Sequence, residues 1–473
     1  MFETSSHSAH ALTAQDISAR IKRLPITRKL SSIRVIIGAA TFFDAYTVLA
    51  IAFAMPVLSR EWKLTPSQIG MILSFGYLGQ LVGAVFFGWL AERIGRLQVL
   101  LLTIILFVGM DVARLFAWNA LSMSAFRFIQ GIGTGGEIPV ASVYINEFIS
   151  AKRRGRFFLL YEVIFPIGLM FAGIAGYFLV PLYGWRAMFL VGLVPAILMI
   201  PLRWSLTESP RWLASKGRLE EADRIVGDLE RAAVKEGKPL AAAETIEIPR
   251  VAERNTDWRE LFQGIYRVRT LTTWAIWFCT YLVINGLITW LPTLYREFFT
   301  LPLQTSLAYG FITSACGVVA SICCAVLIDR IGRRRWYVAA FLLGSIPLVV
   351  LVILGADTAT HVLILVAIAY AILQTIAFSL YLYAAELYPT RLPALGTGCG
   401  SAWLRLGSSS GPLIVGWIVS GYGVRYVFAV FAGVLVSGGP GDLPVCHRDQ
   451  GQRAGTVVTL IKPLNTNLQR STP

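Results

Sequence analysis

The chain has 473 residues, of which 56% are apolar and 15% are charged, and its formal net charge is +15. Soluble proteins carry about 25% charged residues, so this composition, with a mean hydropathy of +0.64, excludes a soluble protein and predicts one that lies in a lipid bilayer. The lysines and arginines lie in short connectors between apolar runs and form no basic domain, so the positive charge does not indicate a nucleic-acid partner.

The N-terminal 33 residues are polar and lack the apolar core of a cleaved signal, so residues 1–33 are predicted to be a cytoplasmic tail. Apolar runs of roughly 20 residues, the length that spans a bilayer as a helix, then predict six spans. These spans lie near residues 34–58, 67–91, 97–118, 121–147, 156–181 and 185–206. Together they predict a first bundle over residues 34–207.

The segment 208–268 is too polar to span, and its helical pattern near 219–231 predicts a cytoplasmic linker with an amphipathic helix. It contains no Gly-rich nucleotide loop and no nucleophile motif that would indicate catalysis. The six cysteines show no metal-ligand spacing, so we expect neither a disulfide nor a metal site. Further spans are predicted near residues 269–295, 303–328, 336–355, 361–385 and 395–421, with a weaker one from Val424, which gives a second bundle over 269–437.

Lysine and arginine are concentrated in every second connector, and the connectors between them are short and poor in charge. Because basic residues favour the cytoplasmic side of a membrane, the N-terminus and the central linker are predicted to be cytoplasmic.

Two connectors share a motif. It reads GWLAERIGR from Gly88 to Arg96 and LIDRIGRR from Leu327 to Arg334, about half a chain apart. The repetition predicts two related halves that move around a central site. Acidic and basic groups here can pair across helix ends, and a small residue such as Gly88 permits close backbone approach, so we interpret the connectors as gates. The alternative is that their arginines only follow the positive-inside rule.

The fourth predicted span contains Arg127, and a cation inside a bilayer costs several kcal/mol unless it is paired. The candidate partner is Asp44 in the first span. Glu137, later in the fourth span, is either part of a proton route or the cap of a polar patch. In the third span, Asp111 and Arg114 lie three residues apart and are predicted to pair for structural reasons.

The glycines of the fourth span, Gly131, Gly133 and Gly135, predict tight helix packing. In the eleventh span, Arg405 precedes the helix-breaking sequence SSSGP, and an unpaired guanidinium there would bind a carboxylate through two parallel hydrogen bonds. The alternative is an acidic partner near the twelfth span. The aromatic residues and the amide of the seventh span either line a pocket or, for the aromatics, face lipid.

These features resemble the major facilitator superfamily of secondary transporters. Four motifs carry the resemblance: the duplicated connector, RFIQGIGTGGE from Arg127, ESPRW from Glu208 and AELYPTR from Ala385. Glu92 and Ala325 depart from the family's connector pattern. The resemblance covers residues from about 34 to 436 and implies an all-α membrane protein with two six-helix bundles, in which the twelfth span is incomplete.

Within the superfamily, ESPRW resembles the sugar-porter branch, whereas the segments around Arg405 and from Gly135 to Ser142 resemble metabolite:proton symporters of niacin and aromatic acids. The resemblance implies proton coupling by Asp44, Arg127 and Glu137, with a static ion pair as the alternative. The expected substrate-binding residues are Arg405, Tyr281, Asn285, Trp277 and Gln130. The expected gating residues are Gly88, Glu92, Arg93, Gly95, Arg96, Glu147, Asp329, Arg330, Gly332, Arg333, Glu386 and Arg391.

The twelfth span breaks after Val436 and leaves about half the residues that a crossing needs. Read one base later, codons for HRDQG at 447–451 can encode IETKG, which resembles the way relatives leave this span. We therefore hypothesise a frameshift near Val436 and expect residues 438–473 to be disordered. A stop or polar codons in the alternative frame before that stretch would contradict the idea.

The predicted function is proton-coupled secondary active transport of a small organic anion, an aromatic or other carboxylate, across the inner or plasma membrane by alternating access. A sugar porter and an efflux pump of the same fold are the alternatives, and a non-transporting membrane sensor is the alternative from another class. The expected partners are a small-molecule substrate, protons and the lipid bilayer. We expect a monomer with no cofactor, no nucleic acid and no enzymatic activity.

Overall fold

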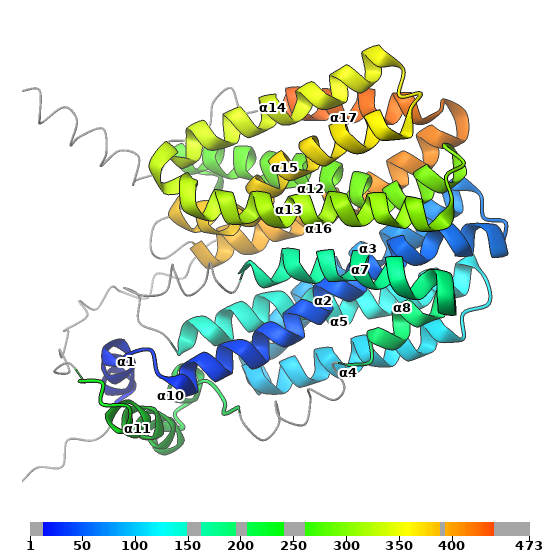
Figure 1. The fold of residues 1–473 in the computed structure, drawn as a ribbon. Coiled ribbons are helices and arrows are strands. Elements are labelled where there is room, and N and C mark those ends of the chain that lie inside the picture. The colour runs from blue at the N-terminus through cyan, green and yellow to red at the C-terminus, as the bar shows by residue number, and fades with distance from the viewer. Residues whose placement is uncertain (1–12, 149–161, 195–205, 241–260, 388–392, 439–473) are drawn as a thin grey trace, which may run out of the picture.

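The computed structural model describes residues 13–148, 162–194, 206–240, 261–387 and 393–438, and within these ranges it consists of helices and the turns between them (Figure 1). The predicted tail at 439–473 and the proposed frameshift lie outside the described residues. So do residues 195–205, which make up half of the sixth predicted span. The domain limits inferred above stay predictions.

Two helical bundles lie side by side (Figure 1). The first contains α2 Arg28–Glu61, α3 Pro66–Ile94, α4 Arg96–Leu115, α5 Ala120–Glu147, α7 Ile164–Tyr183 and α8 Arg186–Val191. The second contains α12 Ile265–Glu297, α13 Leu303–Ile331, α14 Arg333–Leu354, α15 Ala359–Leu387, α16 Pro393–Gly421 and α17 Val424–Gly438. The predicted all-α architecture is therefore confirmed.

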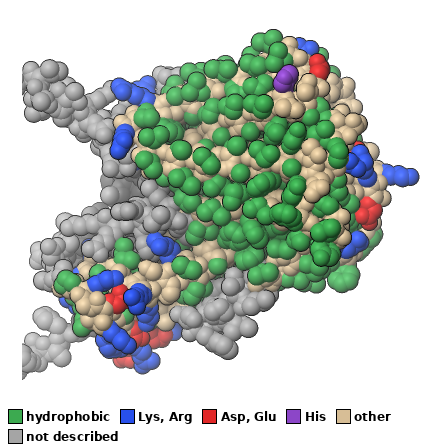
Figure 2. All heavy atoms as spheres, in the orientation of Figure 1, with side chains coloured by type: hydrophobic (Ala, Val, Ile, Leu, Met, Phe, Trp, Pro, Cys, Tyr) green, Lys and Arg blue, Asp and Glu red, His purple; other side chains and the backbone are tan. Residues whose placement is uncertain are grey.

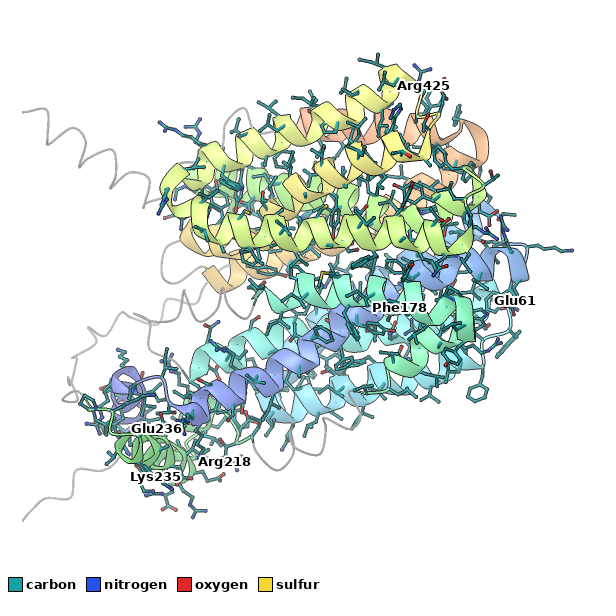
Figure 3. All side chains as sticks on the ribbon, viewed as in Figure 1. Glu61, Phe178, Arg218, Lys235, Glu236 and Arg425 are labelled. Atoms are coloured by element: carbon teal, nitrogen blue, oxygen red, sulfur yellow. The ribbon has the colours of Figure 1, made fainter. Side chains whose placement is uncertain are left out.

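The composition of the helices matches a bilayer. Among the described residues, 8 helices are long and apolar enough to cross a membrane, and α17 is shorter. Apolar side chains cover the broad middle of the surface in Figure 2, while charged side chains gather at its two ends. Phe178, which points outward in Figure 3, is 60% exposed. Such a surface is suited to lipid and not to water.

The turns repeat between the two halves. Gly95, with φ 112°, ends α3 and begins α4, and Gly332, with φ 88°, ends α13 and begins α14. These backbone conformations are strained for any residue with a Cβ atom, so both copies of the connector motif need glycine here.

Small residues let α3 and α5 touch along their length. A Cβ atom on Gly131 would lie 2.0 Å from the Gly76 carbonyl oxygen, and one on Gly135 would lie 2.3 Å from the Gln80 carbonyl oxygen. The glycine run of α5 therefore packs backbone against backbone, as the sequence predicts.

On α3, two glycines of the same helix predict opposite outcomes when replaced by alanine. A Cβ atom on Gly83 would lie 1.9 Å from the Ile132 carbonyl oxygen, whereas one on Gly88 would meet no atom within 4 Å. Gly83→Ala should lower the free energy of unfolding by about 2 kcal/mol or more, because the helices must separate. Gly88→Ala, the matched control, should raise it by about 0.5–1 kcal/mol through helix propensity. Thermal unfolding of the two purified variants tests this, and equal stability losses would contradict it.

Three shorter helices lie at one end of the first bundle, here called the linker end: α1 Ala14–Arg23, α10 Pro210–Ser215 and α11 Leu219–Lys235 (Figure 1). Helix α11 covers the segment where the sequence predicts an amphipathic helix. Helix α1 was not predicted. Its buried Ile17 and Ile21 share a small apolar core with Trp212 of α10 and Val226 of α11.

Ion pairs attach α1 to α11. Arg20 Nη2 lies 2.7 Å from Glu230 Oε2, and Arg23 Nη2 lies 2.6 Å from Glu230 Oε1. Burial pushes the pKa of Glu230 up, but the hydrogen bonds from Arg20 and Arg23 outweigh it and hold the pKa below its usual value. Part of the predicted N-terminal tail is therefore bound to the linker.

The bundles meet most closely at the opposite end, where Glu61 and Arg425 lie in Figure 3. Arg60 Nε lies 3.1 Å from Glu297 Oε1, which joins α2 to α12. The hydroxyls of Ser67 and Ser420 are 3.3 Å apart. A Cβ atom on Gly70 would lie 2.8 Å from the Pro412 carbonyl oxygen. These contacts between α3 and α16 and between α2 and α12 close the space between the bundles at that end.

Candidate functional site

A cavity lies between the two bundles. It is lined by residues of α2, α3, α5, α7, α12, α15 and α16. The described lining residues are Thr41, Val48, Leu49, Tyr77, Gln80, Ile138, Glu162, Phe165, Pro166, Leu169, Tyr281, Ile284, Asn285, Ile288, Tyr370, Gln374, Ala377, Phe378, Tyr381, Leu404, Arg405 and Ser408. Because both bundles contribute, any relative motion of the bundles changes the cavity.

Arg405 is the cation among the described lining residues of this cavity, and it is 3% exposed. Its Nη1 donates to the Ser401 carbonyl oxygen at 2.9 Å, and its Nη2 donates across the bundle interface to the Gly135 carbonyl oxygen at 3.2 Å. Its Nε is buried and donates to no described residue. The predicted acidic partner does not appear among the described ion pairs. A buried guanidinium held by neutral carbonyls keeps its full charge and a spare donor for an incoming anion.

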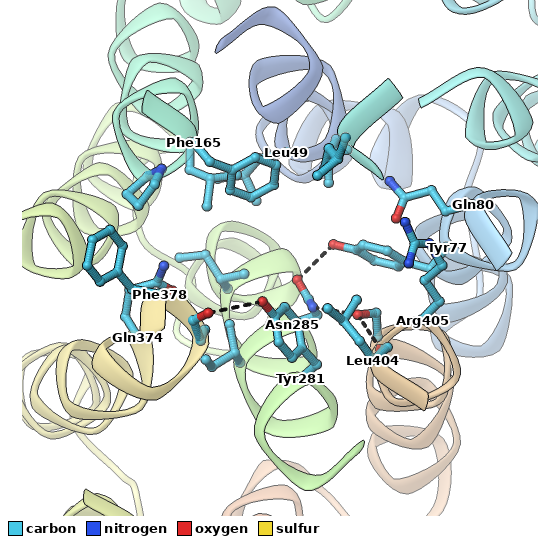
Figure 4. Close-up of a pocket in the computed structure, with 18 of the residues that line it drawn as sticks. Leu49, Tyr77, Gln80, Phe165, Tyr281, Asn285, Gln374, Phe378, Leu404 and Arg405 are labelled. Carbon is cyan, nitrogen blue, oxygen red and sulfur yellow. Dashed lines mark hydrogen bonds between the residues drawn. The ribbon is translucent and has the colours of Figure 1, made fainter. Parts of the chain in front are cut away.

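A second polar group stands beside Arg405 and also joins the bundles. The Tyr77 hydroxyl of α3 donates to Asn285 Oδ1 of α12 at 2.9 Å, and Asn285 Nδ2 donates to the Ser408 hydroxyl at 2.9 Å. Figure 4 shows Tyr77, Gln80 and Arg405 on one side of the cavity and Phe378 on the other. The cavity thus combines a buried cation with aromatic surfaces on both sides and an amide, Gln374, beside Phe378, which suits a ligand with one charged end and a flat body.

Three of the five predicted substrate-binding residues, Arg405, Tyr281 and Asn285, line the cavity. Trp277 does not line it. Its ring packs edge-on against Tyr381 at 4.6 Å between centroids, one layer further out. Gln130 does not line it either, because its amide donates to Asp111 Oδ1 at 2.9 Å inside the first bundle. Helical spacing alone could not distinguish the residues of the first layer from those behind it.

Two of the predicted proton-coupling residues, Asp44 and Glu137, lie close together in the first bundle, and both are fully buried. Neither carboxylate oxygen of Asp44 accepts a hydrogen bond from a described residue, and Glu137 accepts from the Thr41 hydroxyl at 2.9 Å. Glu137 and Arg405 are near enough to Asp44 to interact with its charge. Since Thr41 lines the cavity, this acidic pair lies one layer behind the cavity wall.

The predicted ion pair between Asp44 and Arg127 is not formed in this conformation. Arg127 Nε donates instead to the Ile72 carbonyl oxygen at 2.7 Å, and Nη2 donates to the Leu73 carbonyl oxygen at 3.3 Å. The reason is Gly76, where a Cβ atom would lie 2.7 Å from Arg127 Nη2, so the guanidinium fits against α3. Backbone carbonyls then take the place of the expected carboxylate.

Asp111 and Arg114 form the predicted ion pair within α4, and both side chains are fully buried. The Arg114 guanidinium also lies 4.2 Å from the centre of the Phe189 ring of α8. This pair packs inside the first bundle and contributes no residue to the cavity.

The predicted gate of the first half is built as a network at the linker end. Arg96 Nη2 lies 2.7 Å from Glu92 Oε1 and 3.2 Å from Glu147 Oε1, which joins α3, α4 and α5. Arg93 does not join the network, since its guanidinium lies 4.2 Å from the centre of the Trp89 ring. The expected close approach at Gly88 is not made by any part of the chain that the structure describes, because none of it lies within 4 Å of a Cβ atom at that position.

Glu208 completes this network, although the sequence analysis assigned it only to the ESPRW motif. Its carboxylate accepts from the backbone N–H groups of Arg96 and Leu97, both at 3.1 Å. These N–H groups lie at the N-terminus of α4, where a carboxylate satisfies free donors and interacts favourably with the positive end of the helix dipole. A Cβ atom on Gly95 would lie 2.4 Å from Glu208 Oε2, so the glycine turn makes room for this cap.

The gate of the second half is described in part. Gly332 has the same turn as Gly95, Arg333 is 2% exposed and Arg330 is exposed. Arg391 and the side chains of Asp329 and Glu386 lie outside the described residues.

Sequence reasoning missed Glu162, which lines the cavity two residues before α7. The signal was present, because a carboxylate inside an apolar run is rare and marks a functional position by default.

The chain matches the family described as "Sugar (and other) transporter" over residues 34–439. It is 33% identical over 424 residues to the niacin transporter NiaP of Acinetobacter baylyi, covering 89% of this chain and 95% of that protein. It is 29% identical to a gallate transporter of Pseudomonas putida, covering 88% and 91%. A solved structure of the major facilitator superfamily proton:xylose symporter XylE matches with a TM-score of 0.65 and 16% identity, covering 90% of this chain and 99% of that chain.

Proposed function

This chain belongs to the sugar (and other) transporter family of the major facilitator superfamily, and we propose that it transports a small aromatic carboxylate together with protons. Its relatives are membrane transporters and not enzymes, and they handle small molecules. The substrate class, the coupling to protons and the direction of transport are what we propose.

The observation that carries the substrate class is Arg405, the described cation on the wall of a cavity that also contains aromatic and aliphatic surfaces. Its unused Nε and its Nη2, which holds a neutral carbonyl, offer the two parallel donors that a carboxylate accepts. Phe165, Phe378 and Tyr381 supply flat surfaces for a ring. Niacin and gallate, named for two relatives, each combine an aromatic ring with a carboxylate.

The proton is proposed to bind the acidic pair of Asp44 and Glu137. Asp44 has no hydrogen-bond donor among the described residues, and a buried carboxylate without donors is costly in its charged form. Arg127 is proposed to take part through the cavity, because the Tyr77 phenol lies within its electrostatic range and donates to Asn285 there. Protonation of the acidic pair of Asp44 and Glu137 is proposed to change which arrangement of the two bundles is favoured.

The two ends of the molecule supply the gates. At the opposite end the bundles are closed by Arg60 with Glu297, while Arg96, Glu92, Glu147 and Glu208 tie together helices of the first bundle at the linker end. With the linker end in the cytoplasm, as the basic connectors predict, we propose that the cavity opens toward the cytoplasm in this conformation. We propose a monomer in the inner or plasma membrane.

A sugar porter is the second candidate, because the amides of Gln80, Gln374 and Asn285 line the cavity and can bind hydroxyl groups. The buried guanidinium of Arg405 favours a carboxylic acid over a sugar as the substrate. A drug exporter and a non-transporting sensor differ from the proposed importer in the flux of substrate that vesicles would show.

Thermal unfolding of the purified protein with nicotinate, benzoate, gallate, xylose or glucose tests the substrate class. A ligand at 100 times its Kd adds about 2.7 kcal/mol to the free energy of unfolding, so the acids should raise the midpoint and the sugars should not. Stabilisation by sugars alone would contradict the proposal. Vesicles with an inward proton gradient should then accumulate the stabilising acid, whereas an exporter would not load them and a sensor would show no flux.

A further inference from the structure

We propose that Glu162 takes up a proton when the substrate anion enters the cavity, so that a neutral Glu162 and the bound carboxylate occupy the cavity together. This inference rests on the proposed function and adds a residue to it. Asp44 and Glu137 respond to the bundle conformation, whereas Glu162 is assigned to the binding step.

Glu162 is placed to meet a ligand directly. It precedes α7, and it lines the cavity with Phe165 and Pro166 of that helix. Its side chain forms no ion pair with any described residue. Asp44 and Glu137 do not line the cavity, so Glu162 is the described carboxylate within reach of a bound anion.

The other titratable groups of the cavity come from four helices. They are Tyr77 of α3, Tyr281 of α12, Tyr370 and Tyr381 of α15, and Arg405 of α16. Tyr281 and Tyr381 each lie within electrostatic range of both Glu162 and Arg405, so the cation and the carboxylate face the same part of the cavity. Helix α2 contributes Thr41, Val48 and Leu49, and α13, which also packs on α7, contributes no described lining residue.

Among the described lining residues, the positive charge of Arg405 and the negative charge of an ionised Glu162 balance each other, while Asp44 and Glu137 lie behind the cavity wall. A substrate carboxylate at Arg405 adds a second negative charge beside Glu162. Like charges in an apolar site disfavour each other, and a proton on one of them removes the repulsion. The substrate stays ionised because Arg405 holds it. One proton from water therefore bonds to the Glu162 carboxylate oxygen, and no other bond changes.

Because proton uptake is coupled to anion binding, the proposal predicts a change in anion affinity whose direction damage to the fold would not produce. In the wild-type protein, the affinity for nicotinate or benzoate should fall up to tenfold per pH unit once Glu162 ionises in the empty cavity. Glu162→Gln should remove this dependence, because glutamine carries no charge at any pH. At high pH the variant should therefore bind the anion more tightly than the wild type.

The experiment is isothermal titration of the detergent-purified full chain with nicotinate and with benzoate, between about pH 5 and pH 9. Buffers of different ionisation enthalpy report the protons taken up per anion bound. We expect up to one proton for the wild type and correspondingly fewer for Glu162→Gln. The matched control is Glu61→Gln, a carboxylate at the opposite end that accepts from Trp185, and it should keep the wild-type profile.

An unchanged pH slope in Glu162→Gln, or weaker binding than the wild type at high pH, would overturn the assignment while leaving the proposed substrate class intact. Failure of the wild-type protein to bind either acid at any pH would instead overturn the proposed function, and the role of Glu162 would fall with it.

Discussion

Replacing Arg405 with alanine is expected to weaken the binding of nicotinate or benzoate by about 30-fold or more. Loss of one partner of a buried, hydrogen-bonded charge pair costs about 2–5 kcal/mol, and each 1.4 kcal/mol is a factor of ten. The loss falls on the charged end of the ligand, because the aromatic wall with Phe165 and Phe378 stays in place. Titration calorimetry of the purified variant measures the change.

Arg405 also holds Ser401 and Gly135, so its removal could disturb the protein itself. Arg405→Lys separates the two effects, because lysine keeps the charge but lacks the planar fork and should recover part of the affinity. Arg425→Ala is the matched control: this arginine donates to the Val352 carbonyl oxygen at the opposite end, and its loss should leave binding unchanged. Wild-type affinity in Arg405→Ala would remove this residue from the substrate site.

The sequence predicted the helical architecture well, because hydrophobic length and the repeated glycine turn are local properties. The span ends follow from caps such as Thr65, which forms a reciprocal pair of hydrogen bonds with Gln68 before α3. Tight packing at Gly131 could likewise be predicted, because small residues in a span permit it. Helix α1 was missed, since its short apolar face becomes visible only against α10 and α11.

Interactions between helices were predicted less well. The partner of Arg127 was expected to be a carboxylate because charge requires compensation, but Gly76 lets backbone carbonyls provide it. The distance between the two bundles decides which residues form the first layer of the cavity. The helical periodicity of the sequence carries no information about that distance. Tyr281 and Trp277 are neighbours on one helical face, yet only Tyr281 lines the cavity among the described residues.

Asp44→Asn is expected to abolish accumulation of the acid against its gradient while exchange continues. One coupled proton and a pH difference of one unit supply about 1.4 kcal/mol, enough for a roughly tenfold concentration ratio across the membrane. Without a proton site the ratio should fall to about one. Proteoliposomes with an inward proton gradient measure accumulation, and counterflow of labelled acid without a gradient measures exchange.

The fold should tolerate this change, because asparagine removes a buried charge from a carboxylate that accepts no hydrogen bond. Asp111→Asn is the matched comparison, since Asp111 is equally buried but paired with Arg114. Its loss leaves an unpaired guanidinium and should destabilise the protein by about 3–5 kcal/mol. Asp44→Asn should thus uncouple transport without lowering the unfolding temperature, whereas Asp111→Asn should lower that temperature. If Asp44→Asn accumulates the acid as the wild type does, the coupled proton binds elsewhere, and Glu137 with Glu162 would be the carboxylates to test next.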